Sequence, residues 1–361
     1  MATRTFFLNF FIISIVLLTL SFKLSTAQMV PAVFVFGDSL VDVGNNNHLP
    51  VSIAKANFPH NGVDFPTKKA TGRFSNGKNA ADFLAEKLGL PTSPPYLSLS
   101  SKNVSAFMTG VSFASGGAGI FNGTDETLKQ SMPLTQQVGD YEMVYEELVK
   151  KLGSSAAQNL LTKSLFALVI GSNDIFGYSN SSDPNKSTPQ EYVDLMILTL
   201  KQLIKRIYGH GGRKFFVSGI GSIGCTPSRR VKTQNQTCNE EINSMAVMYN
   251  QKLRSMLQAL NSELQGVSYS YFDSYSIFEN IIQKPSTYGF TEVKAACCGL
   301  GTLKANVPCL PIATYCSNRK DHVFWDLFHP TEATARILVD TLFDGSSQYT
   351  IPMNVRKLVT I

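Results

Sequence analysis

The stretch PAVFVFGDSLVDVGNNN, Pro31–Asn47, decides the fold class. A run of strand-forming residues, Val33–Phe36, stops at Gly37 and is followed at once by Asp38 and Ser39. Gly, Asp, Ser and Asn are common in ordinary turns. In α/β proteins, however, the carboxyl ends of parallel strands are where ligands bind and reactive side chains lie. We therefore interpret Ser39 as a candidate nucleophile at the edge of a sheet.

The rest of the chain alternates between strand-like and helix-like segments. Further strands are expected at Val111–Ala114, Leu165–Ile170, Lys214–Ser218 and Val267–Phe272. Amphipathic helices are expected at Asn79–Leu88, 131–148, Pro189–Tyr208 and Asn239–Leu264, and from Pro330 to Phe343. This alternation predicts a parallel sheet covered by helices on both faces. We expect one domain, residues 28–361, with loop insertions at Ser98–Asn103, Asn180–Ser187 and Lys294–Lys320.

The first residues are typical of an export signal. Arg4 precedes an apolar stretch, 6–22, and the small residues Ser25 and Ala27 follow at cleavage-site positions. We predict a secretory signal peptide at residues 1–27, cleaved after Ala27. An uncleaved membrane anchor is the alternative, but the apolar stretch is at the short limit for a span. We predict no transmembrane segment in the mature chain.

Two further features agree with export. Sequons for N-glycosylation begin at five positions: Asn103, Asn122, Asn180, Asn185 and Asn235. All six cysteines follow residue 220 and are disulfide candidates in an oxidising compartment: Cys225, Cys238, Cys297, Cys298, Cys309 and Cys316. The sequence does not choose among their pairings. A zinc site is disfavoured because there is no C-x-x-C pair and the histidines are scattered. We therefore expect a secreted glycoprotein, located outside the cell, in the cell wall or in the vacuole.

Composition and charge exclude several classes of function. Of the 361 residues, 43% are hydrophobic and 16% are charged, so a large core can form. The net charge is +6, but the basic residues are spread along the chain, and we do not expect nucleic-acid binding. The glycine run at Ser115–Ile120 lacks the lysine of a phosphate loop and does not fit G-x-G-x-x-G. We expect no metal and no organic cofactor.

A serine nucleophile needs a base within hydrogen-bond reach, because its hydroxyl loses a proton as it attacks. Of the five histidines, His329 has the most informative surroundings, WDLFHPTEATA. Asp326 lies three residues before it, and on a turn or helix that spacing brings both side chains to one face. A carboxylate there can hold the imidazole in one tautomer. His322 directly follows Asp321, which is the wrong spacing for one helical face.

Acyl transfer also needs hydrogen-bond donors for the oxyanion of the tetrahedral intermediate. The glycine-rich stretch Gly110–Ile120 follows a predicted strand, and its backbone can approach a substrate closely. A second stretch, Ala167–Ile175, ends its strand with Asn173, whose side-chain amide can donate. Each stretch alone is also explained by an ordinary turn.

Taken in order, these stretches resemble the plant secreted branch of the GDSL esterase/lipase family, in the SGNH-hydrolase superfamily. The resemblance is carried by FVFGDSLVDVGNNN, TGRFSNGKNAADFLAEKLGLP, SFASGGAGI, VIGSND and DLFHPTEA. It covers the chain from about Pro31 to Phe343, and Ser112 departs from it, since the family often has Asn there. The ordered set is specific, although each block is short. The implied fold is a three-layer α/β/α sandwich with a flavodoxin-like parallel sheet.

The resemblance implies a role for each matching residue. Ser39 would be the nucleophile, His329 the base and Asp326 its orienting partner. The implied oxyanion donors are the backbone N–H of Ser39, the side chain of Asn173, and the backbone N–H of Gly119, with Gly117 as the alternate.

The expected function is therefore hydrolysis of a small-molecule or lipid ester through an acyl-enzyme intermediate. Two alternatives stay open at this point. One is an acyltransferase that uses the same residues with an alcohol acceptor, and the other is a secreted binding protein without catalysis. The sequence makes no prediction of the oligomeric state.

Overall fold

The predicted strand at Val33–Phe36 forms β1 (Val33–Gly37), the first strand of a five-stranded sheet. A computed structural model describes residues 28–100, 104–124 and 128–361. The other strands of the sheet are β2 (Leu165–Val169), β3 (Lys214–Ser218), β4 (Ser268–Phe272) and β9 (Thr350–Ile351). The order is β1-β2-β3-β4-β9, in which the first four strands are parallel and β9 pairs with β4 antiparallel.

The predicted strand at Val111–Ala114 lies beside β1 but forms only an isolated bridge. The Val35 N–H donates to the Val111 carbonyl at 3.0 Å, and the Phe113 N–H donates to the Val35 carbonyl at 2.8 Å. Counting this segment, the strand order is the flavodoxin-like 2-1-3-4-5. The order in which successive strands are added to the sheet therefore reverses between β1 and β2. Ligands bind at such a reversal, outside the carboxyl ends of the strands.

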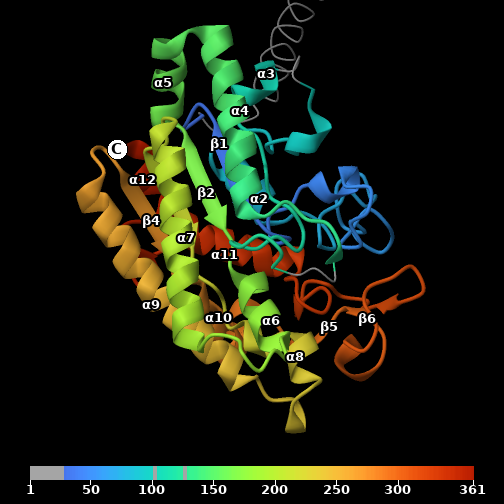
Figure 1. Cartoon of the computed structure of the whole chain (residues 1–361). Coiled ribbons are helices and arrows are strands. Elements are labelled where there is room, and N and C mark those ends of the chain that lie inside the picture. Colours follow the sequence, from blue (N-terminus) through green and yellow to red (C-terminus); the bar gives the residue numbers. More distant parts are fainter. Residues whose placement is uncertain (1–27, 101–103, 125–127) are drawn as a thin grey trace, which may run out of the picture.

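Helices cover both faces of the sheet (Figure 1). The side chains of β1 alternate, so that Phe34 and Phe36 enter one hydrophobic cluster and Val33 and Val35 enter the other. The first cluster is covered by α4 (Leu134–Leu152), α5 (Ser154–Lys163), α7 (Pro189–Gly209) and α9 (Glu240–Glu263). The second is covered by α2 (Ala80–Lys87), α10 (Ser274–Gln283), α11 (Glu332–Asp344) and α12 (Val355–Thr360). The fold is therefore a three-layer α/β/α sandwich, as predicted.

Shorter elements complete the fold. The helices are α3 (Val104–Phe107), α6 (Ser172–Asn180) and α8 (Pro227–Arg230). The segment predicted as a loop insertion, Lys294–Lys320, instead contains β6 (Cys298–Gly299) and β7 (Thr314–Tyr315) and most of β5 (Glu292–Ala296), which pairs with β8 (His322–Phe324). Two disulfides, Cys297–Cys316 and Cys298–Cys309, hold this segment together, and a third joins Cys225 to Cys238. The strands β6 and β7 are only two residues long, and disulfides hold their segment together. The hydrophobic pattern of the sequence therefore did not reveal them.

The predicted signal peptide at residues 1–27 and the sequon at Asn103 lie outside the described residues. Within the described residues, no helix is both long enough and apolar enough to cross a bilayer.

Candidate active site

Three chain segments meet where the sheet order reverses, and together they line a cleft of about 410 Å³. Ser39 follows β1, Asn173 lies in the first turn of α6 after β2, and Gly117 belongs to the glycine-rich segment beside β1. The turn between β8 and α11 supplies Asp326 and His329 to the same cleft. The four sequence stretches that suggested chemistry therefore come together at one place.

Ser39, His329 and Asp326 form a continuous chain of hydrogen bonds. His329 Nε2 lies 2.7 Å from Ser39 Oγ, and His329 Nδ1 lies 2.7 Å from Asp326 Oδ1. Asp326 Oδ1 also accepts the backbone N–H groups of Phe328 and His329, at 3.0 and 2.9 Å. These local bonds fix the carboxylate in a turn, so the imidazole is held between an acid and a hydroxyl.

The end of β1 is held against α4 by Gln137. Its Oε1 accepts the Gly37 N–H and its Nε2 donates to the Gly37 carbonyl, both at 2.8 Å. A side chain at Gly37 would meet the Val169 carbonyl oxygen at 2.3 Å, so only glycine lets β1 and β2 approach this closely here. The following residue, Asp38, closes the turn by accepting the Leu40 N–H at 3.0 Å. Ser39 is thus presented on a rigid turn.

The polar tail of the opening stretch supports the glycine-rich segment. Asp42 accepts the Gly116 N–H at 2.9 Å, and Asn46 donates to the Gly116 carbonyl at 2.8 Å. Asn45 donates to the carbonyls of Ser112 and Ala114, each at 2.8 Å. These asparagines are therefore positioning residues, because they join the segment that follows β1 to the glycine-rich segment.

The two glycines that the sequence suggested as oxyanion donors differ in their position relative to the cleft. Gly117 lines the cleft, whereas Gly119 does not appear among the described residues that line it. A side chain at Gly119 would run into Thr124. In the described part of the chain, the backbone N–H groups of Ser39 and Gly117 donate to no protein acceptor. Both are therefore available to a ligand.

Asn173 and its neighbour Asp174 have different tasks. Asn173 lines the cleft, and one of its side-chain N–H groups donates to the Ala118 carbonyl at 2.9 Å. The other N–H is left for a ligand. Asp174 is fully buried and accepts the N–H groups of Ile120 and Phe121 at 2.9 and 3.2 Å. The sequence pattern alone did not single out Asp174, although its place beside Asn173 after a buried strand was a usable signal.

Two buried carboxyls in the cleft have opposite pKa shifts. Burial opposes ionisation of Asp326, but the His329 charge, the hydrogen bond to that ring and the turn N–H groups hold its pKa below the usual range. Burial raises the pKa of Asp38 from 3.8 to about 7, although the Leu40 N–H and His329 act in the lowering direction. Asp326 is therefore the carboxyl that is ionised near neutral pH, and it is the one that contacts His329.

Asp38→Asn is expected to raise the melting temperature more at pH 8 than at pH 5. Because the folded pKa of Asp38 is raised, its stabilising contribution is complete below pH 3.8 and is lost as the pH rises toward about 7. Asparagine has no proton to lose, and it can still accept the Leu40 N–H. Thermal unfolding of both proteins at the two pH values measures this. An equal temperature difference at both would contradict the assignment.

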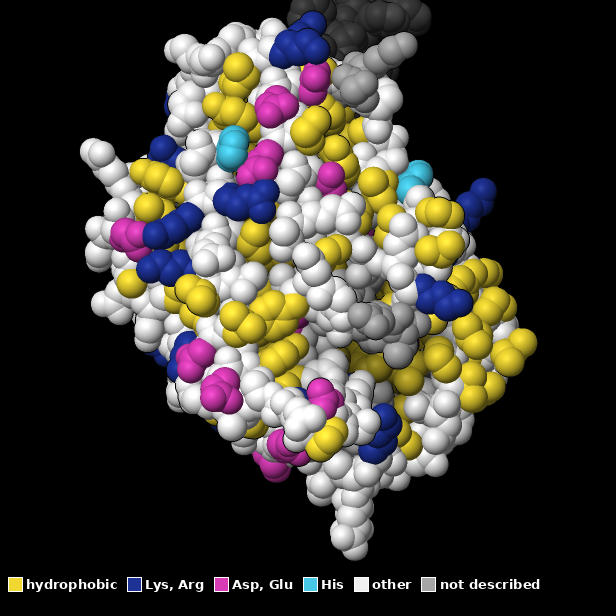
Figure 2. Space-filling view, in the orientation of Figure 1, with side chains coloured by type: hydrophobic (Ala, Val, Ile, Leu, Met, Phe, Trp, Pro, Cys, Tyr) yellow, Lys and Arg dark blue, Asp and Glu magenta, His cyan; other side chains and the backbone are white. Residues whose placement is uncertain are grey.

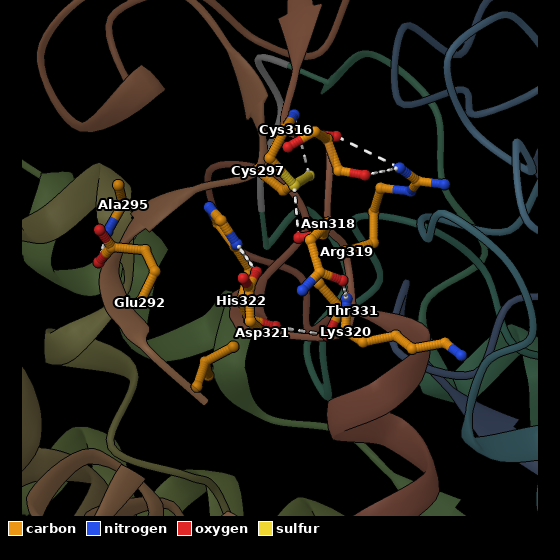
Figure 3. Close-up of polar contacts among 12 residues, drawn as sticks. Glu292, Ala295, Cys297, Cys316, Asn318, Arg319, Lys320, Asp321, His322 and Thr331 are labelled. Carbon is orange, nitrogen blue, oxygen red and sulfur yellow. Dashed lines mark hydrogen bonds and ion pairs between the residues drawn. A yellow bond between two sulfur atoms is a disulfide. The ribbon is translucent and has the colours of Figure 1, made fainter. Parts of the chain in front are cut away.

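A second Asp–His pair lies away from the cleft. His322 Nδ1 lies 2.6 Å from Asp321 Oδ1, near the Cys297–Cys316 disulfide (Figure 3). The adjacent spacing is unsuited to one helical face, as predicted, but the two side chains meet here because Asp321 lies in the turn that precedes β8. His322 does not line the cleft, so this pair is a comparison for the pair at His329 rather than part of the site.

The rim of the cleft includes apolar side chains and a disulfide bond. Cys309 lines it, and its disulfide to Cys298 anchors the neighbouring Leu310. Figure 2 shows hydrophobic side chains gathered on the right of the molecule, over the region of β6, while basic and acidic side chains are interspersed elsewhere on that face. The exposed hydrophobic residues of the rim and the β6–β7 segment include Ile53, Leu310, Ile312, Tyr315 and Phe328. No cluster of three or more metal-ligating side chains occurs within the described ranges.

The chain is similar to known proteins over most of its length. A family model described as GDSL-like lipase/acylhydrolase matches residues 33–342. The chain is similar to a GDSL esterase/lipase of Arabidopsis thaliana, with 53% identity over 340 residues, 92% of this chain and 90% of that protein. Two other Arabidopsis thaliana proteins named GDSL esterase/lipase are 39% identical over 327 residues and 37% identical over 337 residues. These alignments cover 89% and 92% of this chain, and 90% and 86% of the respective relatives.

Proposed function

The chain belongs to the family of GDSL-like lipases and acylhydrolases, and on this premise we propose that it hydrolyses carboxylic esters with Ser39 as the nucleophile. The observation that carries the proposal is the unbroken hydrogen-bond chain from Ser39 Oγ through His329 to Asp326. A serine hydroxyl is activated by such a base, and the base is oriented by such a carboxylate. The protein is a carboxylic ester hydrolase, and its substrate is a small-molecule or lipid ester.

The reaction proceeds in two halves. Ser39 Oγ attacks the ester carbonyl as His329 Nε2 takes its proton, and Asp326 stabilises the imidazolium that forms. His329 then protonates the leaving alcohol, so that the acyl group stays on Ser39. A water molecule, deprotonated by the same imidazole, attacks the acyl-enzyme and releases the acid. The depressed pKa of Asp326 keeps its carboxylate charged throughout this cycle.

The oxyanion formed in each half-reaction is held by three donors: the N–H groups of Ser39 and Gly117 and the side-chain amide of Asn173. Support for Gly117 comes from its position in the cleft and from its unused N–H. We therefore assign to Gly117 the role for which the sequence favoured Gly119.

Asn173→Ala is expected to lower kcat by about 10²–10³ with little change in KM. The amide acts mainly on the charge that develops in the transition state, so its loss does not weaken binding of the neutral ester to the same degree. Hydrolysis of 4-nitrophenyl butanoate by both proteins gives the two constants. Turnover equal to that of the native protein would remove Asn173 from the site.

We propose further that the protein is secreted through the signal peptide at residues 1–27 and is N-glycosylated. Three disulfides are typical of proteins that fold in an oxidising compartment. Four of the five sequon asparagines lie on the exposed surface, namely Asn122, Asn180, Asn185 and Asn235.

A further inference from the structure

Arg229 is a cation in the wall of the catalytic cleft. Its side chain lines the same cleft as Ser39 and His329, yet only 6% of the residue is exposed. The short helix α8 carries it there, because the Ser228 N–H donates to the Leu327 carbonyl at 3.1 Å, within the turn that holds the base. The position of Arg229 is therefore coupled to the catalytic turn.

The guanidinium has few partners for a buried charge. Nη1 donates to Asn180 Oδ1 at 2.8 Å, and the group stacks on the Phe176 ring at 4.4 Å. Nε is buried with no hydrogen-bond acceptor. In the described part of the chain, no carboxylate lies within ion-pair distance of Arg229. Burial lowers the pKa of this guanidinium, and no neighbouring acid opposes that effect.

Two other buried arginines have more protein acceptors than Arg229 has. Arg73 forms two hydrogen bonds of 2.7 Å to the Asp82 carboxylate. Arg230, the next residue after Arg229, donates to the backbone carbonyls of Cys225 and Gln236 at 2.8 and 3.0 Å. The protein therefore supplies at least two hydrogen-bond acceptors to each of those two guanidinium groups. Arg229 lines the cleft, and in the described part of the chain its guanidinium donates to Asn180 alone.

We propose that Arg229 binds a carboxylate carried by the ester substrate, so that the enzyme selects anionic esters. This inference rests on the proposed ester hydrolysis and adds the chemical class of the substrate. A guanidinium presents five N–H donors in a planar fork that matches a carboxylate. An anion bound in the cleft would neutralise a charge for which the described part of the chain supplies no carboxylate.

Helix α6 sets the distance between the two ends of such a substrate. Asn173, Phe176 and Asn180 lie on its cleft face, three and four residues apart. At about 1.5 Å per residue, Asn173 and Asn180 are separated by about 10 Å along the axis. The guanidinium contacts Phe176 and Asn180, so the carboxylate would lie about 5–10 Å from the reacting carbonyl. That separation corresponds to roughly four to eight covalent bonds.

An adjoining apolar cavity can hold the uncharged part of the molecule. It has a volume of about 110 Å³ and lies between the sheet and the helices α2 and α11. Leu40, Phe74 and Phe328 line both this cavity and the cleft. An ester has an acyl part and an alcohol part. We expect one of them to enter this cavity and the other to carry the carboxylate that binds Arg229.

The test compares carboxylate esters with their neutral amide counterparts. On the acyl side, the pair is the mono-4-nitrophenyl ester of adipic acid and 4-nitrophenyl adipamate. On the alcohol side, the pair is 4-carboxyphenyl butanoate and 4-carbamoylphenyl butanoate. For each pair, the ratio of kcat/KM values is measured for the native protein and its variants, which cancels the intrinsic reactivity of the esters.

In one of the two pairs, Arg229→Gln is expected to lower the carboxylate-to-amide ratio by about tenfold or more. Asn180→Asp should lower the same ratio, because the new carboxylate would pair with Arg229 inside the protein. Two variants control for side effects. Ser182→Ala removes the sequon at Asn180 without altering that side chain, and Lys232→Gln removes an exposed positive charge two residues beyond α8. Neither should change the ratio.

Equal ratios for the native protein and for both Arg229→Gln and Asn180→Asp, in both pairs, would overturn the inference and leave ester hydrolysis standing. A ratio lowered as much by Lys232→Gln would also overturn it, because general surface charge would then explain the preference. If none of the esters is hydrolysed, the inference fails. Labelling of Ser39 by a fluorophosphonate then decides whether the proposed function fails with it.

Discussion

Ser39→Ala is expected to lower kcat for 4-nitrophenyl butanoate by about 10⁴–10⁶-fold, with the fold intact. The alanine removes the only atom that forms the acyl-enzyme bond in the proposed mechanism. Ser39 is half-buried at the cleft, and its hydroxyl bonds only to His329, so its loss should change the melting temperature little. Steady-state kinetics on the secreted protein and thermal unfolding of both forms measure these two effects.

The matched control is the double variant Ser39→Ala/His329→Ala. Because nucleophile and base act as one unit, removing both should cost no more than removing Ser39 alone. A fluorophosphonate should label the native protein and neither variant. If Ser39→Ala retains turnover within tenfold of the native protein, another group carries the reaction and the proposed mechanism is wrong.

Asp326→Asn is expected to lower kcat by about 10⁴-fold. An asparagine in this turn can keep its oxygen on the backbone N–H groups of Phe328 and His329, so the local structure is retained. Its amide would then donate to His329 Nδ1. That tautomer places a proton on Nε2, so the imidazole can no longer take the proton of Ser39.

Asp321→Asn is the control, because it alters the other Asp–His pair in the same way. Asp321 and His322 lie outside the cleft, so this variant should keep the native kcat. Equal losses in the two variants would mean that Asp326 acts through stability rather than through the tautomer of His329. Circular dichroism and melting temperatures of both variants complete the comparison.

Local features of the site could be predicted well from the sequence. The strand Val33–Phe36 ends where hydrophobic residues give way to Gly37, and β1 ends within one residue of that point. The pair Asp326 and His329 is three residues apart, and a single turn with two backbone hydrogen bonds brings them together. The helices were found for the same reason, since the period of the hydrophobic residues is a local property of the chain.

Predictions were weaker where neighbours came from distant segments. The segment Val111–Ala114 has the composition of a strand, but it pairs with β1 at one bridge only. Asn45 and Asp42 bind backbone groups of this segment and of the residues after it, and no periodic pattern encodes these contacts. The sequence also did not distinguish Gly117 from Gly119, and only the packed structure shows that Gly117 lines the cleft.

The sequence by itself determined the elements, their order and the chemical types that meet at the strand ends. Those properties follow from short-range patterns, in which the spacing of side chains fixes helix, strand or turn. The tertiary structure alone decided which groups touch across the fold. Ser39 and His329 are 290 residues apart, Gln137 and Gly37 are 100 apart, and Arg229 meets Asn180 from another helix. Such contacts depend on how the layers pack, so a buried arginine without a carboxylate becomes visible only when every neighbour is in place.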